Sequence, residues 1–172
     1  TGLRAREIWG LKVKDFLHEG TKFKVARQLS TNGTFTPTKG KDFRNVPYSQ
    51  NLRTEIEEWI KFNNITDTDR TLFVTTANTP IDHDNFSDRV FQKDMKEAGV
   101  TLIRFHDLRH TALSHMVRRG VRIEIVQKIA GHKDLKTTMR YIHILGEDIS
   151  DVGASLSLAP EKSFKKPELK IV

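Results

Sequence analysis

The chain has 172 residues, of which 37% are hydrophobic and 30% charged, a composition typical of one globular domain and not of a disordered segment. It contains no cysteine, which excludes disulfides, thiol nucleophiles and cysteine-ligated zinc. The formal net charge of +7 favours a polyanionic partner. No apolar run approaches the length of a membrane span and no signal peptide is visible, so we expect a cytoplasmic protein without a membrane partner.

The N-terminal half of the sequence predicts a helix, three strands and a second helix. Apolar residues recur at helical spacing in 1–12, which predicts the first helix. Apolar and polar residues then alternate in 11–19 and 21–29, which predicts two strands of a hairpin, and 43–49 predicts a third strand. The segment 50–64 carries an apolar stripe at helical spacing.

The C-terminal half predicts a succession of helices ended by glycines. A helix at 84–99 stops at Gly99, and the next pattern places Leu108, Ala112 and Met116 on one face and stops at Gly120. Further helical patterns cover 123–132, 135–144 and, weakly, 149–156. We therefore expect an α+β fold, mainly helical, with a small three-stranded antiparallel sheet near the N-terminus.

Five of the seven histidines lie between positions 106 and 143, so metal binding is the first hypothesis to test. His106 and His110 are four residues apart, and "HDLRH" resembles the zinc signature HExxH with Asp107 in place of glutamate. Arg109 lies inside this motif, however, and no carboxylate offers a third ligand at a familiar spacing. The sequence therefore disfavours a zinc site.

A second hypothesis is a non-catalytic helix-turn-helix module that binds DNA. The segment 121–143 has two short helical patterns, a turn that contains glycine, and basic residues on the second helix. This alternative explains the charge but gives the histidine and arginine of "HDLR" no function. It stays open at this point.

A third hypothesis combines the polar residues into a site for phosphodiester cleavage without a metal. Two guanidinium groups can hold the non-bridging oxygens and stabilise their developing charge. A lysine can protonate the leaving alkoxide, a histidine can carry a proton near neutral pH, and a phenol can attack the phosphorus. The residues that supply these groups are Arg4, Lys39, His106, Arg109, His132 and Tyr141.

The same residues lie in motifs that resemble the catalytic domain of tyrosine recombinases, the phage integrase family. "TGLRAREI" and "HDLRHT" are similar to the two arginine boxes of the family, and "GHKDLKTTMRYIH" is similar to its His-to-Tyr segment, with the tyrosine nine residues after the histidine. "KGKDFRNVP" is similar to the Lys-x-x-x-x-Arg-x-x-Pro pattern of the family, with Lys39, Arg44 and Pro47 in register. The resemblance covers roughly residues 1–145 and implies one catalytic domain over that range.

The resemblance also implies roles for these residues and partners for the protein. Arg4 and Arg109 would clamp the scissile phosphate of double-stranded DNA, and Lys39, or less favourably Lys41, would protonate the 5′-oxygen. His106 would be the acid–base partner, His132 would hydrogen-bond the phosphate, and Tyr141 would form a 3′-phosphotyrosyl link. The implied activity is that of a site-specific DNA recombinase or integrase, which needs neither metal nor cofactor and works as a tetramer on DNA.

Several assignments stay open on the sequence alone. His110 and His115 are interpreted as structural, and Glu7 either orients a neighbour or forms a surface salt bridge. Compared with the family pattern, the N-terminal DNA-binding domain and the first catalytic-domain helix are expected to be missing from this chain. The segment 146–172 is expected to form a C-terminal helix and tail, which docks on a neighbouring protomer or on its own core. Site-independent relaxation of DNA, as in type IB topoisomerases, is an alternative use of the same chemistry.

Overall fold

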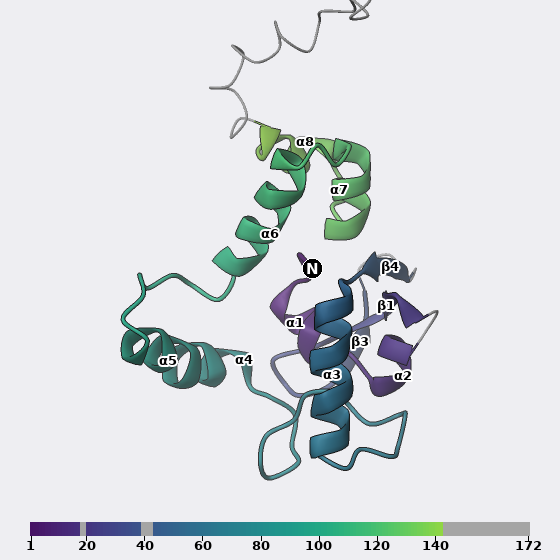
Figure 1. Cartoon of the computed structure of the whole chain (residues 1–172), viewed down its shortest axis with the longest axis vertical. Coiled ribbons are helices and arrows are strands. Elements are labelled where there is room, and N and C mark those ends of the chain that lie inside the picture. Colours follow the sequence, from purple (N-terminus) through teal and green to yellow (C-terminus); the bar gives the residue numbers. More distant parts are fainter. Residues whose placement is uncertain (18–19, 39–42, 143–172) are drawn as a thin grey trace, which may run out of the picture.

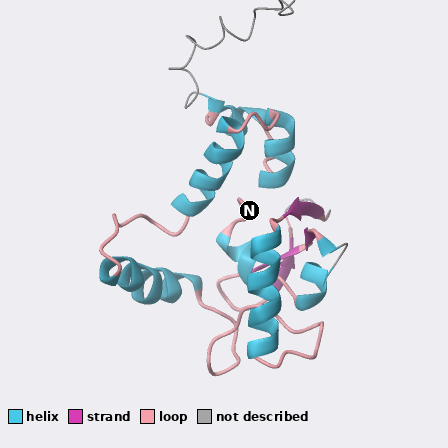
Figure 2. Ribbon diagram, in the orientation of Figure 1, coloured by secondary structure: helices cyan, strands magenta, loops and turns pink. Residues whose placement is uncertain are grey.

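The computed structural model describes residues 1–17, 20–38 and 43–142, and these residues form two groups of elements (Figures 1 and 2). One group contains the strands, the long helix α3 and the short helices α1 and α2. The other contains α6, α7 and α8, drawn in green above it. The N-terminus lies between the two groups. Arg4 connects them, because its side chain donates a hydrogen bond to the Gly131 carbonyl at the end of α7.

The first group begins with two short helices, followed by strands. Its elements are α1 (Ala5–Trp9), α2 (Val13–Leu17), β1 (Lys22–Val25), β2 (Arg27–Leu29), β3 (Phe35–Pro37), β4 (Arg44–Pro47) and α3 (Gln50–Phe62). Side chains from most of these elements share one hydrophobic core, in which Phe16, Val25 and Val46 are almost completely buried. Ser49 caps α3, accepting a hydrogen bond from the Leu52 amide as the sequence suggests.

The strands form two antiparallel pairs. β1 pairs with β4, with Phe23 opposite Val46, and β2 pairs with β3, with Gln28 opposite Thr36. The α+β class and the mainly helical content are confirmed, but the three-stranded sheet of the sequence prediction appears as two two-stranded sheets. β1 and β2 follow each other with only Ala26 between them, and each half of this extended segment has a different partner.

The predicted strand at 11–19 is wrong where the structure describes it, because residues 13–17 form the helix α2. Val13 and Phe16 are both buried, and their spacing of three residues puts them on one side of a helical turn. Asp15 is also buried, accepting a hydrogen bond from the Lys12 amide and pairing with Arg27. Asp15 is in register with Leu11 and Val13, so it interrupts the apolar face that a strand would have, and it is buried here as part of a helix.

The second group, together with the segment that leads to it, is helical. The leading segment contains α4 (His83–Asn85), a π-helical segment η2 (Phe86–Phe91) and α5 (Gln92–Glu97), and it ends at Gly99 as expected. The helices α6 (Asp107–Arg118), α7 (Ile123–Ala130) and α8 (Leu135–Met139) follow. None of the helices in the described ranges is long and apolar enough to cross a membrane.

The buried face of α6 differs from the predicted one by one position. Leu113 and Val117 are buried together with Arg109, whereas Leu108 is 43% exposed. Arg109 takes a core position because backbone carbonyl groups surround its guanidinium, as described below. A charged residue on the buried face is the feature that hydrophobic periodicity could not anticipate.

Candidate active site

Arg109 is buried, with 5% of its surface exposed. Its Nη1 donates to the Gly2 carbonyl at 2.6 Å, and its Nη2 donates to the Ala130 carbonyl at 2.7 Å. These bonds connect α6 to the N-terminal segment and to the end of α7. Burial, followed by the nearby positive charge of Arg4, lowers the pKa of Arg109 to about 10, so the guanidinium still carries its charge at neutral pH.

The Gly2 carbonyl is available to Arg109 because the chain turns sharply there. Gly2 has φ +76°, and a Cβ at this position would lie 2.9 Å from Leu113 Cδ2. Only glycine fits this combination of a left-handed backbone and close approach to α6. The glycine of "TGLR" thus positions the backbone carbonyl that holds the second arginine.

Arg4 lies at the start of α1 and reaches the same region from the other side. Its Nη2 donates to the Gly131 carbonyl at 3.0 Å, and its Nη1 donates to Glu7 Oε1 at 3.1 Å. Its backbone amide donates to Glu7 Oε2 at 2.8 Å, so Glu7 also satisfies a free amide at the helix N-terminus. Arg4 is therefore held by groups that also border His132.

Glu7 forms an ion pair with Arg44 as well as with Arg4. Arg44 Nη1 and Nη2 donate to the two oxygens of Glu7 at 2.9 and 2.6 Å, and its Nε donates to the Ile129 carbonyl at 2.9 Å. Burial alone would raise the pKa of Glu7, but the hydrogen bond and charge of Arg44, with those of Arg4, hold it below its ordinary value. The buried carboxylate is consequently ionised and orients both arginines, which decides between the two alternatives for Glu7.

His132 follows a tightly specified helix end. The His132 amide donates to the Gln127 carbonyl and the Gly131 amide to the Lys128 carbonyl, the pattern of a Schellman motif with Gly131 at φ +65°. A Cβ on Gly131 would also lie 3.0 Å from Arg44 Cζ, so the position has no room for a side chain. This geometry fixes the direction in which the His132 ring leaves the backbone.

Both ring nitrogens of His132 have protein partners. Nε2 lies 3.0 Å from Arg109 Nη2, which can only donate, so Nε2 accepts and Nδ1 carries the hydrogen that it donates to Thr138 Oγ1 at 2.9 Å. Burial, followed by the charges of Arg109 and Arg4, lowers the pKa of His132 to about 4. The imidazole is therefore neutral at physiological pH.

The lowered pKa of His132 predicts a pH-dependent loss of stability. A histidine in the unfolded chain takes up its proton near pH 6.5, whereas His132 in the folded state does so near pH 4, so the unfolded state binds more protons between these values. The free energy of unfolding should be unaffected by this group above pH 6.5 and fall by roughly 2–3 kcal/mol as the pH drops to 4. The free energy of unfolding is measured by denaturant titration at several pH values. Between pH 6.5 and 4 it should fall less steeply with decreasing pH in His132→Asn than in the native chain. His115→Asn, which changes an exposed histidine, is the control. An unchanged slope in His132→Asn would contradict the assignment.

Tyr141 follows α8 and points into its own chain. It is 5% exposed, and its ring stacks at 6° to that of His132, with centroids 6.4 Å apart. Its Oη lies 2.7 Å from His110 Nδ1. The phenol is thus placed against the His132 ring and close enough to Arg109 for the two groups to interact electrostatically.

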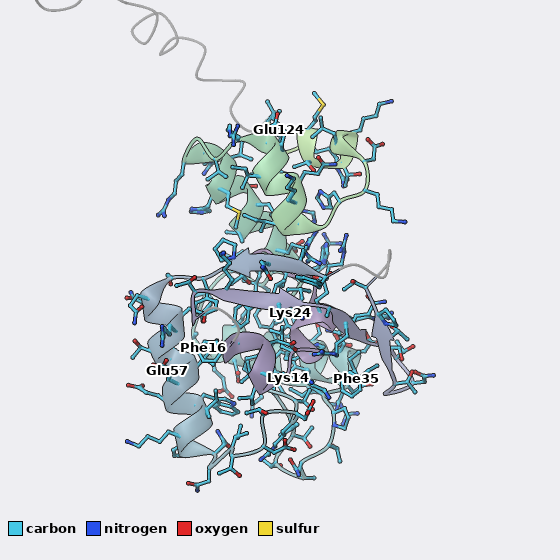
Figure 3. All side chains as sticks on the ribbon, turned by 90° about the vertical axis from the view of Figure 1, so that its right-hand side faces the viewer. Lys14, Phe16, Lys24, Phe35, Glu57 and Glu124 are labelled. Atoms are coloured by element: carbon cyan, nitrogen blue, oxygen red, sulfur yellow. The ribbon has the colours of Figure 1, made fainter. Side chains whose placement is uncertain are left out.

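A cavity of about 590 Å³ opens between β4, α1 and the α7–α8 turn. Its lining includes Arg4, Arg44, His132 and Thr38. Seen from the side in Figure 3, the green helices stand directly above the strands, with side chains filling the space between them. The cavity therefore lies at the junction between the two groups of elements, where the guanidinium groups gather.

The candidate residues are brought together unequally. Arg4, Arg109, His132 and Tyr141 form one connected set through the contacts described above. His106 is exposed at the start of α6 and its ring touches that of His110, with centroids 4.9 Å apart. Lys39 and Lys41 lie outside the described residues, although Thr38, which precedes Lys39, lines the cavity.

Three further residues belong to this region. The sequence marks Arg44 only by its register in "KGKDFRNVP", no motif singles out Thr138, and the sequence favours a structural role for His110. The spacing offered a signal for His110, which lies one helical turn after His106, but nothing in the sequence pairs it with Tyr141. Within the described ranges, no group of three or more histidines and carboxylates is arranged to hold a metal ion.

Comparison with known proteins places these features in a family. The chain is 29% identical over 154 residues to the tyrosine recombinase XerC of Staphylococcus haemolyticus, and 30% identical over 155 residues to the tyrosine recombinase XerA of Pyrococcus furiosus. Each alignment covers 88% of this chain, but the chain spans only about half the length of the curated relatives, 48% and 49% respectively.

Solved structures agree with these relatives. The Tn1549 transposon integrase in complex with a circular intermediate DNA superposes with a TM-score of 0.69 at 25% identity, covering 82% of this chain and 50% of that one. A crystal structure of XerA recombinase also has a TM-score of 0.69, at 22% identity, covering 93% of this chain and 53% of that one, and supports the fold alone. The pattern of the phage integrase family matches residues 1–147, which include the arginine boxes, the hairpin motif and the His-to-Tyr segment, and the chain belongs to this family.

Proposed function

We propose that the protein carrying this chain is a site-specific DNA recombinase that cleaves and rejoins DNA strands through a phosphotyrosyl intermediate. The observation that carries the proposal is the convergence of Arg4, Arg109, His132 and Tyr141 at one positively charged junction. Three guanidinium groups, those of Arg4, Arg44 and Arg109, surround one ionised carboxylate, Glu7. The two net positive charges match a phosphodiester that gains negative charge as a nucleophile attacks it.

In this proposal Tyr141 is the nucleophile and the two arginines of the boxes hold the phosphate. Arg109 makes three of its donor contacts to Gly2, Ala130 and His132 among the described residues, so its plane is fixed before DNA binds. A fixed guanidinium needs no reorganisation when charge develops, which is the condition for strong electrostatic stabilisation. A phosphate oxygen that takes the Arg109 hydrogen bond would free His132 Nε2 to serve the phosphate after a change of tautomer.

Two further residues complete the proposed chemistry. Lys39, with Lys41 as the substitute, would protonate the departing 5′-oxygen, and the position of Thr38 in the cavity lining supports a lysine at the edge of the site. His106 would act as an acid–base partner, and partial burial of its ring, followed by the neighbouring charges of His110 and Arg109, lowers its pKa. Neither a metal ion nor a nucleotide cofactor takes part, because the phosphotyrosyl ester conserves the energy of the broken bond for rejoining.

Double-stranded DNA is the proposed partner, and the full protein would act as a tetramer that joins two duplexes. The net charge of +7 and the DNA-bound Tn1549 transposon integrase among the structural neighbours support the choice of DNA. The helix-turn-helix alternative is less well supported, because α8 has only five residues and its region turns Thr138 and Tyr141 inward. A recognition helix needs its side chains on the protein surface to reach the edges of the bases.

Trapping of a covalent protein–DNA adduct tests this proposal. The complete protein is incubated, in the presence of EDTA, with nicked duplexes that tile the DNA on both sides of its own gene. A nick beside the cleavage point lets the short strand diffuse away, so the adduct should accumulate as a slower band in a denaturing gel. The pattern of reactive tiles gives the target site. Failure of every tile to form an adduct, or complete inhibition by EDTA, would contradict the proposal.

A further inference from the structure

The hydrogen bond between His110 and Tyr141 is unexplained by the roles proposed so far. His110 Nδ1 lies 2.7 Å from Tyr141 Oη, and in the described part of the chain this is the side chain that contacts the phenol oxygen. The residue assigned to acid–base chemistry from the sequence, His106, lies one turn earlier on α6 and is exposed. The structure therefore puts a different histidine on the oxygen that attacks.

Two histidine rings, those of His110 and His132, contact the Tyr141 ring. The centroids of the His110 and Tyr141 rings are 5.8 Å apart, and the two ring planes make an angle of 37°. The His132 ring stacks on Tyr141 with an angle of 6° between the planes. The Tyr141 amide donates to the Thr138 carbonyl, and Thr138 in turn pairs with His132. The phenol is held so that its oxygen meets His110 Nδ1.

The surroundings of His110 suit a group that accepts a proton and passes it on. His110 is only half-buried, whereas Tyr141 is 5% exposed, so the histidine connects the buried oxygen to the outside. The His106 ring packs edge-on against it at 4.9 Å, and Asp107 on the same helix is close enough to interact electrostatically with it.

We infer that His110 is the general base that takes the proton of Tyr141 when the phenol attacks DNA. This inference rests on the proposed function and assigns the proton transfer from Tyr141 to His110 instead of His106. With Nε2 carrying the hydrogen, His110 Nδ1 accepts the proton as the O–H bond of Tyr141 breaks and its oxygen bonds to phosphorus. The bond from phosphorus to the 5′-oxygen breaks, and that oxygen takes a proton from the separate acid assigned to Lys39. In the reverse step, His110 returns its proton to the tyrosine.

The test compares His110→Ala and His110→Asn with the native protein in the adduct assay. Asparagine places a carbonyl oxygen near the position of Nδ1, so it can accept the phenol hydrogen bond but cannot keep the proton. Both variants should form the adduct about 10²- to 10³-fold more slowly, as expected for the loss of a general base. Added imidazole should partly restore His110→Ala and leave Tyr141→Phe inactive. His115→Ala, at an exposed position of the same helix, should react at the native rate.

A substrate with sulfur in place of the bridging 5′-oxygen separates this role from that of the leaving-group acid. Sulfur leaves without protonation, so a Lys39→Ala defect should shrink on this substrate while the His110→Ala defect should persist. If His110→Ala forms the adduct at the native rate or faster, the hydrogen bond only restrains the tyrosine. If His110→Asn forms it at the native rate, the hydrogen bond only orients the tyrosine. Either result, or rescue of His110→Ala by sulfur, overturns the inference. If the native protein forms no adduct at all, the proposed function itself fails.

Discussion

Tyr141→Phe should abolish covalent adduct formation, lowering its rate at least ~10⁴-fold, because it removes the attacking oxygen while leaving the ring in place. The ring keeps its stacking with His132 and its buried position, so DNA binding should change little. The loss of the hydrogen bond to His110 should lower the free energy of unfolding by only about 1 kcal/mol. Adduct yield in a denaturing gel and DNA binding by gel shift are measured side by side.

Tyr48→Phe is the matched control, because the sequence contains only two tyrosines. Tyr48 is partly buried and packs against Phe16 and Phe23 of the core, and its hydroxyl donates to the Phe16 carbonyl at 3.0 Å. Its removal should cost a similar amount of stability and no activity. Adduct formation by Tyr141→Phe, or its loss in Tyr48→Phe with the fold intact, would show that the nucleophile has been misassigned.

Arg109→Lys should produce the second largest effect, on stability and on chemistry together. The guanidinium bridges the Gly2 and Ala130 carbonyls and His132 at once, and one ammonium group cannot satisfy all three from the same position. Leaving buried carbonyls unpaired should lower the free energy of unfolding by about 2–4 kcal/mol. The rate of adduct formation per folded molecule should fall a further 10²- to 10³-fold, roughly the effect of losing one fixed donor to a developing oxyanion.

Arg118→Lys, at the exposed end of the same helix, controls for the exchange of arginine for lysine. It should unfold within about 0.5 kcal/mol of the native protein and react at the native rate. Denaturant titration and single-turnover trapping, both on folded protein, separate the two effects. An Arg109→Lys protein that is less stable but reacts at the native rate would restrict Arg109 to a structural role.

The sequence predicts much of the site because its motifs lie at places where the backbone is constrained. The glycines of "TGLR" and "AGHK" have positive φ angles, and each lies beside an arginine or histidine of the site. Such glycines, with charged residues close to them in the sequence, can be recognised without knowledge of the fold. The start of α3 after Ser49 and the helix ends at Gly99 and Gly120 are predictable for the same local reason.

The errors arise where tertiary contacts override local patterns. The pattern in 11–19 predicts a strand, yet residues 13–17 form a helix in which Val13 packs in the core and Asp15 pairs with Arg27 inside the protein. Likewise, the stripe predicted for α6 treats Arg109 as a surface residue, because its partners are carbonyls 107 and 21 positions away. Pairing across such separations cannot be derived from periodicity.

The contact between His110 and Tyr141 shows the same limit for function. The two residues are 31 positions apart, and their meeting depends on how α8 folds back against α6. From the sequence, the acid–base role is assigned to His106, and His110, four residues later on the same helix, is interpreted as structural. Only the packing of α6 distinguishes the exposed histidine from the one that reaches the phenol.

The attachment point of DNA on the protein tests the central claim most directly. The trapped adduct can be digested with nuclease and trypsin and its peptides sequenced by mass spectrometry. The account predicts a nucleotide phosphate on the peptide that begins at Tyr141, directly after the cleavage site at Arg140, and on the tyrosine itself. A phosphate attached to Tyr48, to a serine or to a histidine, with Tyr141 unmodified, would contradict it.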